Sequence, residues 1–136
     1  MPELAEKQTI MVVDDTAENL KLLEGMLEGE GYDVRMFPSG AMMLRAAEKK
    51  VPDLVMLDIL MPDMDGYEVC RRMRASEALR DVPVLFLSAL TDVKNKVKAF
   101  EVGGMDYVTK PFQFEEVNAR VKTHLLLRRA LREIEG

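Results

Sequence analysis

The chain has 136 residues, and its 24 acidic residues outnumber its 19 lysines and arginines, for a formal net charge of −5. This length suits one domain with its own core, and the negative charge argues against a nucleic-acid-binding surface on this chain. Cys70 is the only cysteine, so an intrachain disulfide is excluded and reducing surroundings are expected. The sequence shows neither a secretion signal nor an apolar run of the ~18 residues that span a membrane, so we expect a cytoplasmic protein without a membrane partner.

Short apolar runs alternate with segments of helical periodicity along the whole chain. The first half predicts, in order, a strand at 10–13, a helix with Leu20, Leu23 and Leu27 on one face, a strand at 32–37, a helix starting at Ser39, and a strand at 54–57. The second half predicts a helix with Tyr67, Cys70 and Met73 on one face, a strand at 84–87, a helix with Val93, Val97 and Phe100, a weaker strand at 107–109, and a last helix from about Gln113. Asp15 or Thr16 is placed to cap the first helix, and Gly103–Gly104 to end the fourth.

Five alternations of strand and helix predict right-handed crossovers and a parallel sheet covered on both faces. The strands are continuously apolar, which agrees with burial on both sides. We therefore expect a single α/β domain, a three-layer α/β/α sandwich with five strands and five helices.

Polar side chains follow four of the five predicted strands at the point where each strand ends. They are Asp14 and Asp15, Asp58, Ser88, and Lys110. The second strand ends in Phe37–Pro38 without a charge, as expected of an edge strand away from a site. Ligands of open parallel sheets bind outside the carboxyl ends of the strands, so agreement among four ends favours a site over chance or capping.

Three carboxylates at one rim repel each other unless a cation joins them, and hard oxygen ligands without histidine or cysteine favour Mg²⁺. Mg²⁺, one lysine and one hydroxyl suit a phosphoryl group with three oxygens to neutralise. The attacking atom is then a carboxylate oxygen, which gives an acyl phosphate. Asp58, at the end of a central strand, is the best candidate nucleophile.

The segments "VVDDTAENL", "PDLVMLDILMPDMDGYEVCRRMR", "VPVLFLSAL" and "GGMDYVTKPF" resemble, in this order and spacing, the receiver domain of bacterial two-component response regulators. The resemblance covers nearly the whole chain. It implies a phosphorylation-operated signalling switch with a flavodoxin-like sheet order of 2-1-3-4-5. A change in the surface of the fourth helix, fifth strand and fifth helix is then expected to regulate an output domain or effector protein.

The resemblance also implies a role for each rim residue. Asp58 accepts the phosphoryl group from a sensor histidine kinase, a phosphotransfer protein or a small acyl phosphate. Asp14, Asp15, Asp58 and the backbone carbonyl of Leu60 hold Mg²⁺, with Mn²⁺ as an alternative ion. Ser88 and Lys110 contact the bound phosphoryl group, and Tyr107 is the switch aromatic that turns inward with Ser88. The Lys110–Pro111 peptide bond is expected to be cis.

Several positions depart from the commonest family pattern or invite a second reading. Gly104 stands where the family often has alanine, which suggests a looser approach to the fifth strand. Leu60 and Leu90 flank the path of an attacking water, which suggests slow hydrolysis of the phosphorylated state. Cys70 is expected in the core and His124 at the surface or an interface, while the cluster of Arg128, Arg129 and Arg132 is expected to be a solvated helix end.

The expected division is a receiver domain at 1–123 and an extension of the last helix at 124–136. Leu127, Leu131 and Ile134 form a short heptad seam there, suited to a linker to an output domain or to a homodimer formed on phosphorylation.

Such a module phosphorylates and dephosphorylates itself and is not an enzyme with an outside substrate. The alternative is a Mg²⁺-dependent phosphatase of haloacid-dehalogenase type with an aspartate nucleophile, although its second aspartate two places after the nucleophile is missing. A flavodoxin-like electron carrier lacks its phosphate loop and flavin-stacking aromatics.

Overall fold

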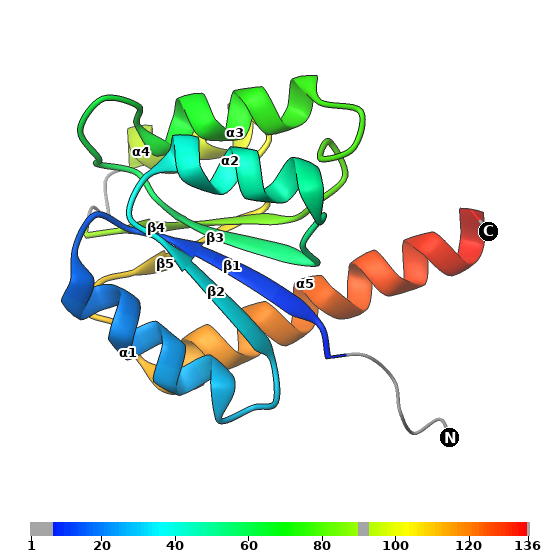
Figure 1. Ribbon diagram of the computed structural model, residues 1–136, viewed down its shortest axis with the longest axis horizontal. Helices are drawn as coiled ribbons and strands as arrows, with labels where there is room; N and C mark the ends of the chain where they lie inside the picture. Colours follow the sequence, from blue (N-terminus) through cyan, green and yellow to red (C-terminus); the bar gives the residue numbers. More distant parts are fainter. Residues whose placement is uncertain (1–6, 90–92, 136) are drawn as a thin grey trace.

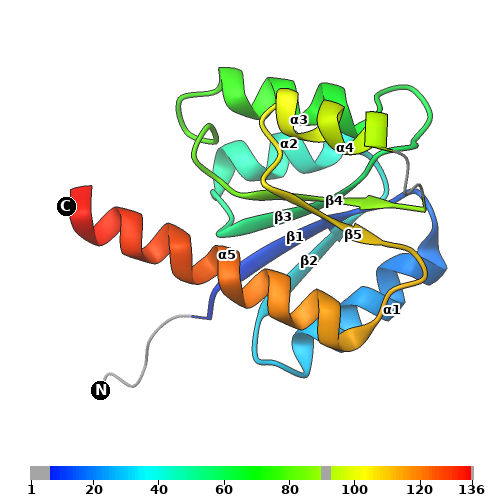
Figure 2. The ribbon, with the colours of Figure 1, turned by 180° about the vertical axis from the view of Figure 1, so that it is seen from behind.

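The structure, a computed structural model, describes residues 7–89 and 93–135. Strands and helices alternate along the chain as β1(Thr9–Val13), α1(Ala17–Glu28), β2(Asp33–Phe37), α2(Gly40–Lys49), β3(Leu54–Asp58), α3(Gly66–Ala75), β4(Val84–Ser88), α4(Val93–Glu101), β5(Asp106–Thr109) and α5(Phe114–Glu135). The strands form one parallel sheet in the order β2-β1-β3-β4-β5. Helices α2, α3 and α4 cover one face of this sheet, and α1 and α5 cover the other (Figures 1 and 2). The predicted three-layer sandwich and its strand order are confirmed.

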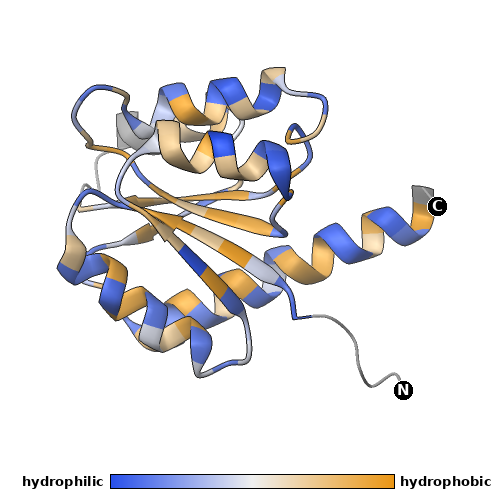
Figure 3. Ribbon diagram, in the orientation of Figure 1, coloured by the Kyte–Doolittle hydropathy of each residue, from blue (hydrophilic) through white to orange (hydrophobic). Residues whose placement is uncertain are grey.

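The core consists of two apolar layers, one on each face of the sheet. All residues of β1, β3 and β4 are buried, whereas the edge strand β2 is only partly buried. Alternate residues of each strand point to opposite faces, so Val55 and Leu57 pack under α2 and α3, and Leu54 and Met56 pack against α1 and α5. Figure 3 shows the result, with apolar strands between helices that are apolar on one side.

One of the predicted helix starts differs from the structure, and another agrees with it. Thr16 occupies the N-cap position of α1 but makes no side-chain capping bond; the Asp14 carboxylate instead accepts a bond from the Thr16 N–H. Ser39 does cap α2 and accepts from Met42 N. Helices α1 and α2 therefore begin in different ways, and only α1 begins at the rim aspartates.

Val97 and Phe100 of the predicted α4 stripe do not point into the core, and the Val93 side chain lies outside the described part of the structure. Val97 and Phe100 are 51% and 53% exposed, while Ala99 between them is buried. The small Ala99 side chain of α4 and the neighbouring Val102 make the contact with the core, so Val97 and Phe100 remain at the surface.

The approach to β5 is tight, contrary to the looseness predicted for Gly104. A Cβ atom at Gly104 would lie 2.4 Å from Phe86 Cε2 and 2.9 Å from the Ala99 carbonyl oxygen. The large Phe86 ring of β4 therefore fills the space that a side chain at position 104 would need. Cys70 is buried as predicted, and burial raises the pKa of its thiol.

Two residues of α5 are not at the surface as the sequence suggested. His124 is 11% exposed and lies 3.1 Å from Asp106. Arg128 is 10% exposed and donates to the Pro52 carbonyl oxygen at 2.9 Å. The last turns of α5 then extend past the body of the domain (Figure 2), where Leu127, Leu131 and Ile134 are 53%, 57% and 81% exposed. No helix within the described ranges has the length and apolar character needed to cross a bilayer.

Candidate functional site

The register of the sheet brings the polar strand ends together. Val13 pairs with Leu57 across β1 and β3, so the residues that follow them, Asp14 and Asp58, are neighbours at the rim. Ser88 ends β4 beside Thr109 of β5, and Lys110 comes next. Asp58 and Ser88 are themselves the last residues of β3 and β4, and both are buried. All predicted side chains from β1, β3, β4 and β5 thus lie at one edge of the sheet.

Lys110 is the cationic centre of this edge. Its Nζ lies 3.1 Å from Asp58 Oδ1 and 3.4 Å from Asp14 Oδ2. Asp15 is exposed beside them, and one carboxylate oxygen from each of the three aspartates falls within 4.8 Å of the others. Three carboxylates and one ammonium leave an excess of negative charge, which a divalent cation can compensate.

Asp14 is fixed by the beginning of α1. Its Oδ1 accepts from the Thr16 N–H at 2.9 Å, and its Oδ2 accepts from Asn19 Nδ2 at 3.2 Å. The sequence reasoning did not single out Asn19, although it stands inside the motif "VVDDTAENL". The available signal was its spacing, because a residue five places after Asp14 lies in the first turn of the helix and faces back to the rim.

The environment of Asp58 opposes its ionisation. Burial and the neighbouring Asp14 raise its pKa to about 6, although the hydrogen bond and charge of Lys110 work in the opposite direction. A cation that replaced the repulsion from Asp14 with attraction would favour the ionised form.

The loop after β3 folds back onto the strand end. Gly66 N–H donates to the Ile59 carbonyl oxygen at 2.9 Å, and Asp65 caps α3 by accepting from the Glu68 N–H. A Cβ atom at Gly66 would lie 2.3 Å from the Asp58 carbonyl oxygen. Only glycine fits where the loop backbone approaches the end of β3 this closely. This explains why an acidic loop ending in Asp65–Gly66 follows the apolar strand.

A small pocket of about 160 Å³ opens at this rim, lined by Asp15, Thr16, Asp58, Ile59, Leu60, Leu87, Ser88, Ala89 and Lys110. The Leu60 side chain is 68% exposed at its mouth. Leu90, its predicted partner beside the path of water, lies outside the described residues. The Lys110–Pro111 peptide bond is cis, as predicted.

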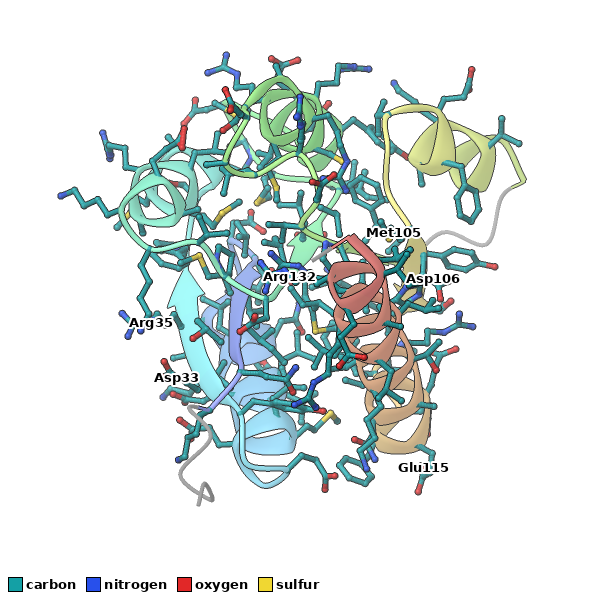
Figure 4. The ribbon with its side chains drawn as sticks, turned by 90° about the vertical axis from the view of Figure 1, so that its right-hand side faces the viewer. Asp33, Arg35, Met105, Asp106, Glu115 and Arg132 are labelled. Carbon is teal, nitrogen blue, oxygen red and sulfur yellow. The ribbon has the colours of Figure 1, made fainter. Side chains whose placement is uncertain are left out.

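Tyr107, the predicted switch aromatic, is half-buried on β5 beneath Arg120 of α5, whose Cζ lies 5.7 Å from the ring centroid. Arg120 also donates to Asp106 at 2.7 Å, and His124 Nε2 lies 3.1 Å from the other oxygen of the same carboxylate. Burial works to raise the pKa of Asp106, but the bonds from His124, the Tyr107 N–H and Arg120 lower it. Figure 4 shows Asp106 at the edge of β5 beside α5. Sequence reasoning did not predict this network.

The donor set fits Mg²⁺. The clustered atoms are hard carboxylate oxygens, and the rim pocket contains no histidine or cysteine, which is the ligand type that Mg²⁺ prefers over softer metals. Asp14 and Asp15 come from one turn and Asp58 from the neighbouring strand, so the set is held by two rigid elements.

Comparison with known proteins identifies the family and supports the fold. The family model described as the response regulator receiver domain matches residues 10–122. The chain is 42% identical over 120 residues to the DNA-binding dual master transcriptional regulator RpaA of a Synechocystis strain. The aligned region covers 88% of this chain and 49% of that protein. The chain thus spans about half the length of the curated relatives it matches.

Solved structures give the same result. A putative response regulator from Chloroflexus aurantiacus superposes with a TM-score of 0.86 at 38% identity, over 89% of this chain and 99% of the other. The receiver domain of the sensor histidine kinase PA1611 from Pseudomonas aeruginosa superposes with a TM-score of 0.82 at 31% identity, over 88% and 98% of the two chains. That structure contains a magnesium ion coordinated in its active-site cleft.

The chain belongs to the response regulator receiver domain family. It is a signalling protein, and its receiver domain is a phosphorylation-operated switch of a two-component system. These relatives give no support to the haloacid-dehalogenase alternative.

Proposed function

We propose that Asp58 is the phosphoacceptor of this switch and that Asp14, Asp15 and Asp58 hold the Mg²⁺ that the reaction requires. The contact of Lys110 with both Asp58 and Asp14 carries this proposal. The Lys110 ammonium lies between Asp14, a candidate metal ligand, and Asp58, the candidate nucleophile. Leu60 lines the same pocket, and we assign its backbone carbonyl as a further ligand.

Bound Mg²⁺ would supply positive charge for the phosphoryl oxygens and for the three carboxylates. The protein's own groups do the rest. Asp58 attacks phosphorus with one carboxylate oxygen and the bond to the donor breaks, leaving an acyl phosphate. Lys110 exchanges its carboxylate contacts for a phosphoryl oxygen, and the Ser88 hydroxyl donates to another. Mn²⁺, with similar oxygen preference, is proposed as a functional substitute.

The switch is proposed to work through differential contacts. A phosphoryl group gains the Ser88 contact only when the end of β4 closes on it, so phosphorylation favours the closed conformation. Tyr107 then turns inward and leaves Arg120, which changes the surface of α4, β5 and α5. Val97 and Phe100, exposed on α4, belong to that surface and suit contact with a partner.

The donor is proposed to be a sensor histidine kinase or phosphotransfer protein, and the target an output domain or effector protein. Residues 1–123 form the receiver and residues 124–136 a helical extension that links to the target or pairs with a second copy. No outside substrate is turned over. The exposed Leu60 at the mouth of the pocket supports a slow loss of the phosphoryl group, because an apolar side chain there does not orient water.

The decisive experiment is intact-mass measurement after incubation with acetyl phosphate, with and without Mg²⁺. One phosphoryl group is expected on the native chain in the presence of Mg²⁺, and none on Asp58→Asn. The matched control is Asp63→Asn, which removes an exposed charge from the same loop at a left-handed residue (φ 69°) that asparagine also tolerates. It should be phosphorylated like the native chain.

Size-exclusion chromatography of the same samples tests the dimer, since earlier elution only of the phosphorylated form supports it. Uptake by Asp58→Asn equal to that of the native chain would refute the assignment of Asp58. Turnover of a phosphomonoester by the native chain would contradict the absence of an outside substrate.

A further inference from the structure

A groove lies at the opposite end of the sheet from Asp58, between α5 and the N-terminal ends of the strands. Its main hollow has a volume of about 450 Å³ and joins a smaller one of about 190 Å³ through four shared residues, Gln8, Tyr32, Leu125 and Arg129. A volume of this size accommodates a small-molecule ligand. Tyr32 and Leu125 give the groove an apolar wall, and the remaining lining is strongly charged.

The charge of the lining is positive although the chain as a whole is negative. Lys7, Arg128, Arg129 and Arg132 face two acidic residues, Glu30 and Asp53. Both acids already have partners, because Glu30 pairs with Lys122 at 3.4 Å and Asp53 accepts from the Thr9 N–H at 2.7 Å and lies 3.8 Å from Arg128. Among the side chains that the structure describes, Lys7, Arg129 and Arg132 form no ion pair, so the described lining of the groove is positive.

The arginines are held close together in spite of their repulsion. Arg128 and Arg132 are one helical turn apart, a spacing at which like charges destabilise a helix. Burial and then the charge of Arg132 lower the pKa of Arg128. The Nε of the largely buried Arg128 has no hydrogen-bond partner. In Figure 4, Arg132 lies on the side of α5 that faces β1, where it lines the groove and remains accessible to solvent.

We propose that this groove binds a small phosphate-bearing anion, such as a nucleotide or a polyphosphate. Guanidinium groups match phosphate oxygens with two parallel hydrogen bonds, and a multiply charged anion would relieve the repulsion between Arg128 and Arg132. The apolar wall at Tyr32 and Leu125 favours a nucleotide over bare phosphate. This site is separate from the rim and does not depend on the proposed role of Asp58.

Isothermal titration calorimetry with ATP and pyrophosphate tests the proposal. Divalent cations are left out so that the acidic rim repels both probes, and salt is kept well below the ~0.1 M at which charges are screened over about 10 Å. The test variant is Arg129→Gln/Arg132→Gln. The control, Arg71→Gln/Arg72→Gln, removes the same charge from exposed positions of α3 that pair with Glu68.

We expect saturable binding of one molecule of each probe to the native chain, with a dissociation constant below ~1 mM. The groove variant should bind at least ~10-fold more weakly, a loss of about 1.4 kcal/mol, and the α3 variant within about twofold of the native chain. Tighter binding of ATP than of pyrophosphate would identify a nucleotide, and the reverse a polyphosphate. The proposal fails if neither probe binds, if both variants lose affinity equally, or if a short DNA duplex displaces ATP and binds more tightly.

Discussion

The two ends of the parallel sheet carry opposite charge and are built differently. The carboxyl-end rim is acidic, and its groups come from four separate strands, each fixed by the strand that ends there. The amino-end groove is basic, and most of its cations come from one helix, α5, laid across the strand starts.

This difference determines how each region responds to change. Strands pairing in fixed register leave the rim little freedom, so substitutions there act through close contacts and through repulsion among carboxylates. The groove depends on how α5 sits against the domain, and Arg128 is the polar contact that holds α5 at the groove end, while Arg120 and His124 bind Asp106 further along the helix. The rim is expected to be more sensitive than the groove to single substitutions.

The largest expected effect is steric and occurs at the rim. Gly66→Ala places a Cβ atom against the Asp58 carbonyl oxygen, and should lower the free energy of unfolding by about 2 to 3 kcal/mol. The control is Gly25→Ala in α1, where nothing lies within 4 Å; it should stabilise by about 0.5 to 1 kcal/mol. Urea denaturation measures both. Equal effects would mean that the loop after β3 is not tightly packed.

The second effect is electrostatic. Without divalent cations at pH 7.5, Asp58→Asn should raise the free energy of unfolding by about 1 to 2 kcal/mol, because it removes a buried charge beside Asp14. Asp63→Asn, exposed in the same loop, should change it by less than about 0.5 kcal/mol. Added Mg²⁺ should then stabilise the native chain but not Asp58→Asn. A destabilised Asp58→Asn would show that Lys110 already neutralises the rim.

The third effect is a dependence on pH. The pKa of Asp58, about 6 in the folded chain, exceeds the unfolded value of about 3.9, so without metal the fold loses stability as pH rises from about 4 to 6. Mg²⁺ binding requires the ionised carboxylate and has the opposite dependence. Its affinity should fall about tenfold between pH 7.5 and pH 5, as measured by the Mg²⁺-induced shift in Tm. In Asp58→Asn this difference should disappear.

The smallest effect is expected at the groove end. Arg128→Ala removes the hydrogen bond to the Pro52 carbonyl oxygen and should lower the free energy of unfolding by about 1 kcal/mol. Arg129→Ala, exposed on the next position of α5, should be neutral within about 0.5 kcal/mol. A loss at Arg128 larger than that at Gly66 would reverse the comparison between the two ends.

The sequence was sufficient to predict the fold and the position of the rim. Continuous apolar runs identified the strands, and in a parallel sheet residues that follow the strands must meet at one edge, so Asp14, Asp58, Ser88 and Lys110 could be grouped without a structure. The position of each of these residues is determined mainly by the strand that precedes it, and that strand can be recognised from a short stretch of sequence.

Features that depend on packing between distant segments could not be predicted. Arg128 and Pro52 are 76 residues apart, and periodicity alone made Arg128 part of a solvated helix end. His124 was likewise assigned to the surface because its partner, Asp106, belongs to another element. The exposure of Val97 and Phe100 depends on how α4 is oriented against the sheet. The fit of Gly104 likewise depends on the space that the Phe86 ring occupies. Periodicity gives a helix face but not the direction in which that face points.

The contact of Arg128 with Pro52 has a consequence for the rotational phase of α5. Each helical residue turns the chain by about 100°, so one fixed side chain sets the direction of every later one. With Arg128 directed to the start of β3, Leu127, Leu131 and Ile134 face away from the body. Inserting seven residues after Arg128 would leave this phase almost unchanged, whereas inserting two would turn it by about 200°. A partner that contacts the seam therefore meets it in the orientation that Arg128, together with the buried Leu125, gives to the end of α5.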